Sequence, residues 1–215
     1  MKKDYKILRN VKNSDDFTKD GFWEEISCIA IKDYLWMKNS YRPEVYIKVC
    51  YNNDYIFVKF DVFEEEITAR FNSVNDPVYK DSCVEFFINL FPSESNKYFN
   101  FEINAIGTIY VGFGAKESRT KILTEDIKDI SIHSILNTPY VGKLKDKKWK
   151  IILKIPLKLF EKHYNTKFNY KNAKGNFYKC GDETKYEHYG AWNKIHSELP
   201  NFHLPDFFGD LSFSI

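Results

Sequence analysis

Three polar side chains, Glu85, Glu102 and Asn104, occupy mid-strand positions in two segments that have the alternating pattern of β-strands. Carboxylates are poor strand formers, so their positions suggest a role beyond the fold. Because alternate residues of a strand share a face, we expect all three on one face of a sheet, flanked by Phe87 and Tyr98. Acids and an amide beside aromatic rings suit a ligand with polar edges and flat faces, such as a sugar. The alternative is the solvated outer face that most antiparallel sheets have.

The two glutamates also allow a catalytic interpretation. If Glu85 and Glu102 lie directly opposite each other on paired strands, they are about 5 Å apart. That spacing is close to the carboxyl separation of retaining glycosidases, where one residue acts as acid and the other as nucleophile. The register that decides this is left open by the pattern. The sequence carries no Gly-rich phosphate loop, no zinc-ligand spacing among its histidines, and no serine or cysteine nucleophile motif.

A hairpin must position these residues. Its strands are expected over 83–90 and 98–105, joined by the polar turn 92–96. The apolar rows of the two strands are expected to face a core. These rows are Val84, Phe86, Ile88 and Leu90 on the first strand, and Phe99, Phe101, Ile103 and Ala105 on the second.

The rest of the chain repeats the strand pattern, with one short helix expected from Pro156 to Tyr164 and a helical turn or long loop over 115–128. Residues 1–20 are expected to form a loosely ordered lead-in with one short strand at most. Further strands are expected over 45–51, 55–62, 67–71, 108–113, 130–136, 140–144, 149–155, 176–180 and 211–215. This succession predicts an all-β fold, an antiparallel β-sandwich with little helix, as a single domain over 1–215.

Several residues outside the hairpin have an expected place. Trp23, Trp36 and Trp192 are interpreted as core residues, and Glu64 as part of a solvated acidic bend over 64–66. The cysteines at 28, 50, 83 and 180 form no C-x-x-C pair, which favours reduced thiols, mostly buried.

Charge and hydropathy exclude several partners. The net charge of +2 gives no strong field toward nucleic acid or a membrane surface. No apolar stretch approaches the length of a membrane span, and no apolar run follows the first charged residues as in a signal peptide. We therefore expect a soluble, cytoplasmic protein without nucleic-acid or membrane partners.

Two parts of the chain together resemble a known family, the family 9 carbohydrate-binding modules, and more closely the stand-alone family-9-like proteins of bacteria. The resemblance covers about residues 20–215. Its motifs are DPVYKDSCVEFF at 76–87 with FEIN at 101–104, and NFYKCGD at 176–182 with GAW at 190–192 and PNFHLPDFFG at 200–209.

The resemblance implies a β-sandwich that holds a sugar between two aromatic rings, with polar side chains on its hydroxyls. By position, Tyr79 stands near the first aromatic and Phe202 at the second, where the best-known members have Trp. Glu85 and Asn104 match polar contacts, and Glu102 stands where some members have Arg. The acidic calcium loops of the family are not clearly present, so no cofactor is expected, with calcium as the alternative.

We therefore predict a non-catalytic protein of carbohydrate metabolism that binds a mono- or oligosaccharide. The predicted ligand-binding residues are Tyr79, Glu85, Glu102, Asn104 and Phe202, with no catalytic or metal-binding residue. Two alternatives stay open: a glycoside hydrolase that uses Glu85 and Glu102, and a protein-interaction module.

Overall fold

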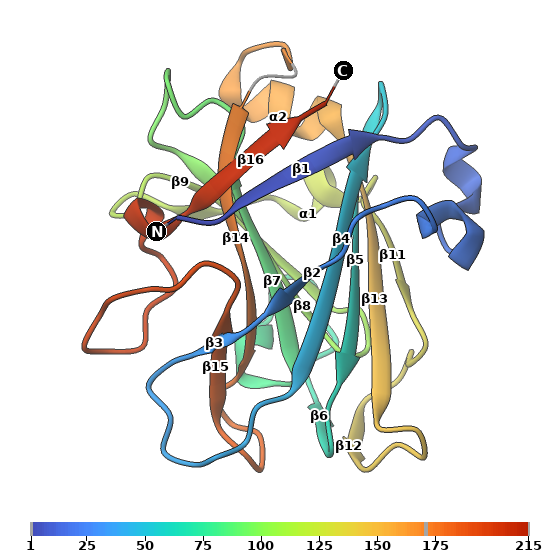
Figure 1. The fold of residues 1–215 in the computed structure, drawn as a ribbon, viewed down its shortest axis with the longest axis vertical. Coiled ribbons are helices and arrows are strands. Elements are labelled where there is room, and N and C mark those ends of the chain that lie inside the picture. The colour runs from blue at the N-terminus through green and yellow to red at the C-terminus, as the bar shows by residue number, and fades with distance from the viewer. Residues whose placement is uncertain (1, 170–171, 215) are drawn as a thin grey trace.

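The structure is a computed structural model that describes residues 2–169 and 172–214. Within these residues, fourteen strands join in one continuous hydrogen-bonded sheet, which curls so that its two halves face each other as layers (Figure 1). Helices are short, and none in the described part of the chain is long and apolar enough to cross a membrane. The prediction of a β-sandwich with little helix is confirmed.

The first layer carries the predicted hairpin. It contains β10 (Thr120–Lys121), β9 (Ile109–Gly114), β8 (Tyr98–Asn104), β7 (Cys83–Asn89), β14 (Asn172–Gly181) and β16 (Gly209–Phe213), in that spatial order. The short strands β15 (His188–Ala191) and β3 (Asp33–Tyr34) extend it beside β14.

The second layer consists of β4 (Glu44–Tyr51), β5 (Tyr55–Phe63), β13 (Lys148–Pro156) and β11 (Ser131–Ser134), with β2 (Ile29–Ile31) beside β4. A separate pair is formed by β6 (Ile67–Ala69) and β12 (Tyr140–Gly142). The helical elements are α1 (Thr124–Ile127), α2 (Leu157–Tyr164), and the 3-10 turns η1 (Ser14–Asp16), η2 (Asp20–Trp23), η3 (Val78–Lys80) and η4 (Pro205–Phe207).

The core lies between the layers and contains both predicted apolar rows of the hairpin, whose members are all buried. Phe86 stacks on Phe177 with ring centroids 5.0 Å apart and an interplanar angle of 8°. Phe177 meets Phe60 of the second layer edge to face at 6.3 Å. Such aromatic pairs add directional packing to the burial of apolar area, so the orientation of the two layers is well determined.

The strand β1 (Asp4–Arg9) joins the two layers and corrects the expectation of a purely antiparallel sheet. Residues Asp4–Ile7 pair in parallel with β16, and Leu8 and Arg9 then pair in parallel with β4 (Figure 1). Because β1 runs in the same direction as both neighbours, the sheet is mixed. β1 is the one short strand that the lead-in over 1–20 was expected to contain at most, and its pairing connects the lead-in to both layers.

The residues after β1 cover the outer face of the second layer. Phe22 and Trp23 of η2 and the nearby Ile26 are buried against Phe57 and Ile152. Trp23 donates its indole N–H to the carbonyl of residue 17 at 2.7 Å. Trp23 is therefore a core residue, as predicted, and this segment shields apolar side chains of β5 and β13 from water.

A charged cluster crosses the core and corrects the expectation for Glu64. The Glu64 carboxylate is buried, accepts a hydrogen bond from the Trp149 indole at 2.9 Å, and lies 3.3 Å from the Lys179 ammonium. Lys179 also contacts His188 Nε2 at 2.7 Å. His188 Nδ1 lies 2.6 Å from the carbonyl of residue 186, so Nδ1 carries the proton and Nε2 accepts from Lys179. Glu64 is thus a buried ion-pair partner and not part of a solvated bend.

Candidate functional site

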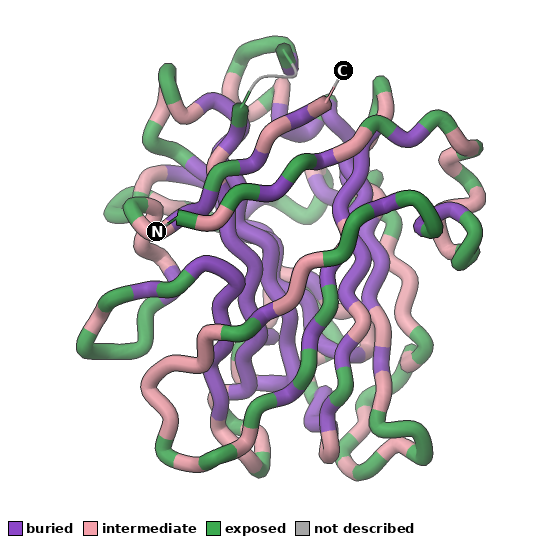
Figure 2. Tube along the Cα trace, in the orientation of Figure 1, coloured by how far each residue is buried: buried purple, intermediate pink, exposed green. Residues whose placement is uncertain are grey.

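The face of β7, β8 and β14 that is turned away from the core forms the floor of a pocket of about 630 Å³. Every residue of β7 and β8 is buried, so these strands are covered on both sides (Figure 2). Glu85 and Glu102 are only 3% and 5% exposed. Glu85 and Glu102 therefore lie at the floor of a pocket and not on a solvated outer face.

Strand register sets four side chains in one row across this floor. Glu85 pairs directly with Glu102 between β7 and β8, which answers the register question left open by the sequence. Tyr178 of β14 pairs with Glu85 on one side, and Tyr110 of β9 pairs with Glu102 on the other. Two carboxyl groups are thus held next to each other between two phenol rings.

Burial governs the protonation of this pair. It raises the pKa of Glu85 well above its ordinary value, and the neighbouring Glu102 carboxyl raises it further. Burial also raises the pKa of Glu102, against the opposing effects of a hydrogen bond from Asn100 and the charge of Arg119. Since two anions in this position would repel in a medium of low polarity, the neutral acid form is favoured. A neutral carboxyl group both donates and accepts hydrogen bonds.

Asn100 adds a polar atom to the pocket lining. Its Nδ2 donates to Glu102 Oε1 at 2.9 Å, while its buried Oδ1 has no hydrogen-bond partner among the described residues. This oxygen lies over Gly112, the residue opposite Asn100 on β9, where a Cβ atom would collide with it. A residue without a side chain is therefore needed at 112 to leave room for the amide.

Arg119 brings a positive charge to the pocket lining, which also contains Lys121, and sequence reasoning missed it. It precedes β10 in the charged stretch 115–128, for which only a helical turn or a loop was expected. Its guanidinium donates to the Tyr98 hydroxyl at 2.8 Å, and that hydroxyl lies 3.2 Å from His203 Nδ1. Burial, followed by the charge of Arg119, lowers the pKa of His203 to about 3, so the imidazole is neutral and accepts from Tyr98. A positive charge thus reaches the pocket from β10 although position 102 carries an acid.

Tyr79 lies at the rim of the pocket on η3 and is 39% exposed. Its backbone carbonyl accepts a hydrogen bond from the Asp182 amide at 3.3 Å. The next residue, Lys80, forms an ion pair with Glu183 at 2.8 Å. These contacts connect η3 to the turn after β14, so the backbone that carries the Tyr79 ring is held in place.

Phe202 lines the same pocket from the loop before η4 and is 9% exposed. Its ring is stacked on Tyr178, with centroids 4.2 Å apart and planes at 7°. Trp36, which was expected in the core, also lines the pocket and lies 6.0 Å from Phe202. Its backbone has a φ of 53°, an uncommon value for a bulky residue, and its indole donates to the carbonyl of residue 197 at 2.7 Å. Phe202 is therefore part of an aromatic cluster at the pocket and not a single ring.

Asn104 is the predicted site residue that does not line the pocket. Its Nδ2 donates to the carbonyl of residue 71 at 2.8 Å and to Asp81 Oδ2 at 3.1 Å, and its Oδ1 accepts from the amide of Thr108 at 2.9 Å. These bonds use both ends of the buried amide. Asn104 therefore holds the turn after β8 against the segment that leads into η3, and leaves nothing to offer a ligand.

One group of side chains in the described part of the chain has the donors and spacing for a metal ion: Cys83, Glu85 and Cys180. Two of its three donors are sulfur, whereas calcium prefers oxygen ligands. The group is therefore poorly suited to the calcium considered above.

One family model covers most of the chain. The sequence model of the family described as Carbohydrate-binding family 9 matches residues 21–213. A curated protein of Arthroderma benhamiae (strain ATCC MYA-4681 / CBS 112371), named Extracellular protein, is 25% identical over 191 residues, which cover 80% of this chain and 79% of the relative.

Solved structures extend the likeness to the whole fold. A candidate carbohydrate-binding protein from Bacteroides uniformis ATCC 8492 has a TM-score of 0.89 and 29% identity, with all of both chains covered. A family 9 carbohydrate-binding module from Caldicellulosiruptor kristjanssonii in complex with glucose has a TM-score of 0.65 and 13% identity, covering 99% of this chain and 96% of that one. A family 9 module from the same organism in complex with cellotriose has a TM-score of 0.63 and 12% identity, covering 98% of this chain and 93% of that one.

Proposed function

Because the chain belongs to carbohydrate-binding family 9, we propose that it binds a mono- or oligosaccharide in the pocket over β7 and β8 without cleaving it. One observation carries the proposal: Tyr79 and Phe202, which are far apart in the sequence, line the same pocket over the buried pair Glu85 and Glu102. A volume of about 630 Å³ falls within the roughly 300–1,000 Å³ of small-ligand sites.

The side chains divide the work of recognition. The Tyr79 ring at one rim, and Phe202 with Trp36 at the other, offer apolar faces to the C–H faces of a sugar ring. Glu85 and Glu102, as neutral acids, donate to and accept from its hydroxyls, and Arg119 adds a charged donor. The unpaired Oδ1 of Asn100 is an acceptor that a sugar hydroxyl can satisfy.

Family membership supports binding over hydrolysis, whereas the protonation of the pair is compatible with either. A retaining glycosidase needs one ionised carboxylate as nucleophile beside one neutral acid. Burial raises the pKa of Glu85 well above its ordinary value and that of Glu102 to about 7, so near neutral pH one carboxylate can stand beside one neutral acid. The preference for binding therefore comes from membership of a family of carbohydrate-binding modules.

Calorimetry on the full chain tests the proposal, starting with glucose and cellotriose because structural neighbours form complexes with them. A glycan array widens the search to other sugars. We expect Tyr79→Ala to weaken the binding found at least tenfold, about 1.4 kcal/mol, since it removes one wall of the site. The matched control is Phe63→Ala, because Phe63 is also 39% exposed but lies on β5 in the other layer.

Two results would contradict the proposal. One is the absence of binding to any saccharide on the array. The other is turnover of nitrophenyl glycosides that Glu85→Gln abolishes, which would favour the hydrolase alternative. An unchanged affinity in Tyr79→Ala would reject this pocket as the site while leaving sugar binding itself in place.

A further inference from the structure

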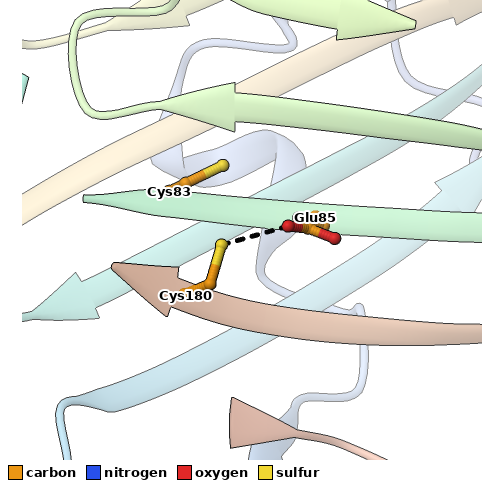
Figure 3. A group of neighbouring side chains, drawn as sticks. All are labelled: Cys83, Glu85 and Cys180. Atoms are coloured by element: carbon orange, nitrogen blue, oxygen red, sulfur yellow. Dashed lines mark hydrogen bonds between the residues drawn. The ribbon is translucent and has the colours of Figure 1, made fainter. Parts of the chain in front are cut away.

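Two thiols and a carboxyl group lie close together on the paired strands β7 and β14 (Figure 3). Cys83 of β7 pairs directly with Cys180 of β14, and Glu85 lies two residues after Cys83 on the same face. One ligand atom from each residue lies within 4.8 Å of the others. Cys180 Sγ donates a hydrogen bond to Glu85 Oε1 at 3.0 Å. The cluster thus stands on two paired strands in the interior of a sheet.

We propose that Cys83, Glu85 and Cys180 bind a thiophilic divalent cation of the zinc class, with one coordination position open to the pocket. This goes beyond sugar binding and does not depend on it. Nothing in the fold requires the ion, since the three groups are satisfied as neutral acids.

The donor set and its spacing suit such an ion. Zinc binds thiolate sulfur at about 2.3 Å and carboxylate oxygen at about 2.0–2.2 Å, in tetrahedral geometry. Donors around such an ion are roughly 3.5–4 Å apart by the same bond lengths. The three atoms already lie within 4.8 Å, so rotation of side chains suffices and the paired backbones need not move.

The electrostatic surroundings favour a cation over bare thiolates. Cys83 and Cys180 are at most 1% exposed, so a bare thiolate at either position would lack solvation. The nearby cations are engaged elsewhere: Arg119 donates to Tyr98, and Lys179 binds Glu64 on the core side of β14. A divalent ion displaces the protons and supplies the missing positive charge, since coordination deprotonates a thiol outright.

The pocket supplies the fourth position. Glu85 and Cys180 line the pocket, whereas Cys83 is not part of its lining. Water or a ligand oxygen therefore approaches the ion from the pocket side. Three protein ligands with one open position is the arrangement of reactive zinc sites, in contrast to the four protein ligands of structural ones.

Cobalt(II) titration of the reduced full chain tests the proposal, after all four free thiols have been counted. We expect one Co²⁺ per chain, with a thiolate-to-cobalt charge-transfer band and the strong visible bands of a tetrahedral site. Cys83→Ser and Cys180→Ser should lose the charge-transfer band. Cys28→Ser and Cys50→Ser are matched controls that should keep it, because Cys28 is exposed and Cys50 is buried away from the cluster.

A second measurement guards against misfolded variants. Zinc should raise the thermal midpoint of the wild-type protein, because a ligand that binds the native state stabilises it, and this rise should vanish in Glu85→Gln, which keeps both thiols. The proposal is overturned if no charge-transfer band appears at stoichiometric cobalt. It is also overturned if the band survives in the double variant Cys83→Ser/Cys180→Ser, or disappears in Cys28→Ser.

Discussion

The carboxyl groups of Glu85 and Glu102 are held side by side on adjacent strands, where they are more stable as neutral acids than as anions. The hydroxyl group of a sugar is both a donor and an acceptor. A neutral carboxyl group can both accept a hydrogen bond from this hydroxyl and donate one to it, whereas a carboxylate can only accept. The pair is therefore suited to uncharged ligands, and its protonation links ligand binding and stability to pH.

The pH dependence of stability is predicted to be weaker in Glu102→Gln. Below the ordinary pKa of 4.5 this residue is protonated in both folded and unfolded chains and has no effect. As the pH rises above that value, the unfolded chain loses the proton while the folded chain retains it, so stability falls until the raised folded pKa is passed. Urea unfolding at pH 5, 6, 7 and 8 should show the variant gaining relative to the wild type as the pH increases.

Glu183 supplies the control of opposite sign. A hydrogen bond from Lys80 lowers the pKa of Glu183, so this residue contributes stability above its ordinary pKa and loses it as the pH falls. Glu183→Gln should therefore lose stability relative to the wild type as the pH increases, and only slightly, because the ion pair is exposed. A Glu102→Gln difference that stays constant with pH would contradict the assigned protonation.

The sequence predicted some of the residues that line the pocket. The alternating strand pattern placed Glu85 and Glu102 on one face of the sheet, and both line the pocket together with Tyr79 and Phe202. Asn104 lies two residues after Glu102 and so on the same face, yet hydrogen bonds to neighbouring loops occupy its amide. Arg119 and Trp36 reach the pocket from irregular segments, where no periodicity tells which way a side chain points. Strand patterns thus predicted the floor, and the walls depended on loop conformations that local sequence does not encode.

At the scale of elements, strands with several alternating apolar residues were predicted within one to four residues of their observed ends, including β4, β5, β7, β8, β13 and β14. The short strands β2, β3, β10 and β15 were missed, whereas the equally short β6, β11 and β12 were predicted as parts of longer segments. Two to four positions are too few for a period to identify a strand with certainty. In β14 an inward position carries Lys179, which interrupts the apolar row and pairs with Glu64. That ion pair is visible only in three dimensions.

Removal of one member of this buried pair should be strongly destabilising. Lys179→Ala leaves the Glu64 carboxylate in the core without its cation, for which a loss of about 3–5 kcal/mol is typical. Lys179→Met combined with Glu64→Gln should recover part of that loss, because it removes both charges together. Urea denaturation measures each free energy of unfolding.

The exposed pair Lys185–Glu66, with a separation of 2.6 Å, offers the matched control. Lys185→Ala should cost far less than Lys179→Ala, since water screens exposed ion pairs. An equal loss in Lys179→Ala and Lys185→Ala would mean that burial of the first pair has no energetic consequence.

At the scale of the molecule, β1 connects the layers, and Tyr5 adds a side-chain tie. Its hydroxyl donates to the carbonyl of Ser27 at 2.7 Å and accepts from the amide of Val49 on β4 at 3.0 Å. Tyr5→Phe leaves this buried N–H without its partner, so we expect a loss of about 1–3 kcal/mol in the free energy of unfolding. The measurement is again urea denaturation.

Tyr46→Phe is the control, because the Tyr46 hydroxyl is bonded to Glu44 on an exposed surface. A surface substitution of this kind should change the free energy of unfolding much less than Tyr5→Phe does. If Tyr5→Phe proved equally neutral, the link between the layers would rest on the backbone pairing of β1 alone.

The parallel pairing of β1 also constrains the order in which the chain can acquire its shape. Asp4 pairs with Asp210, so this joint can form only after nearly the whole fold between these two residues has been made. Contacts between such distant residues are slow to form because a very long loop must close first. Each half can assemble hairpin by hairpin, but until β1 is in place the facing edges of β4 and β16 remain open to unwanted strand partners.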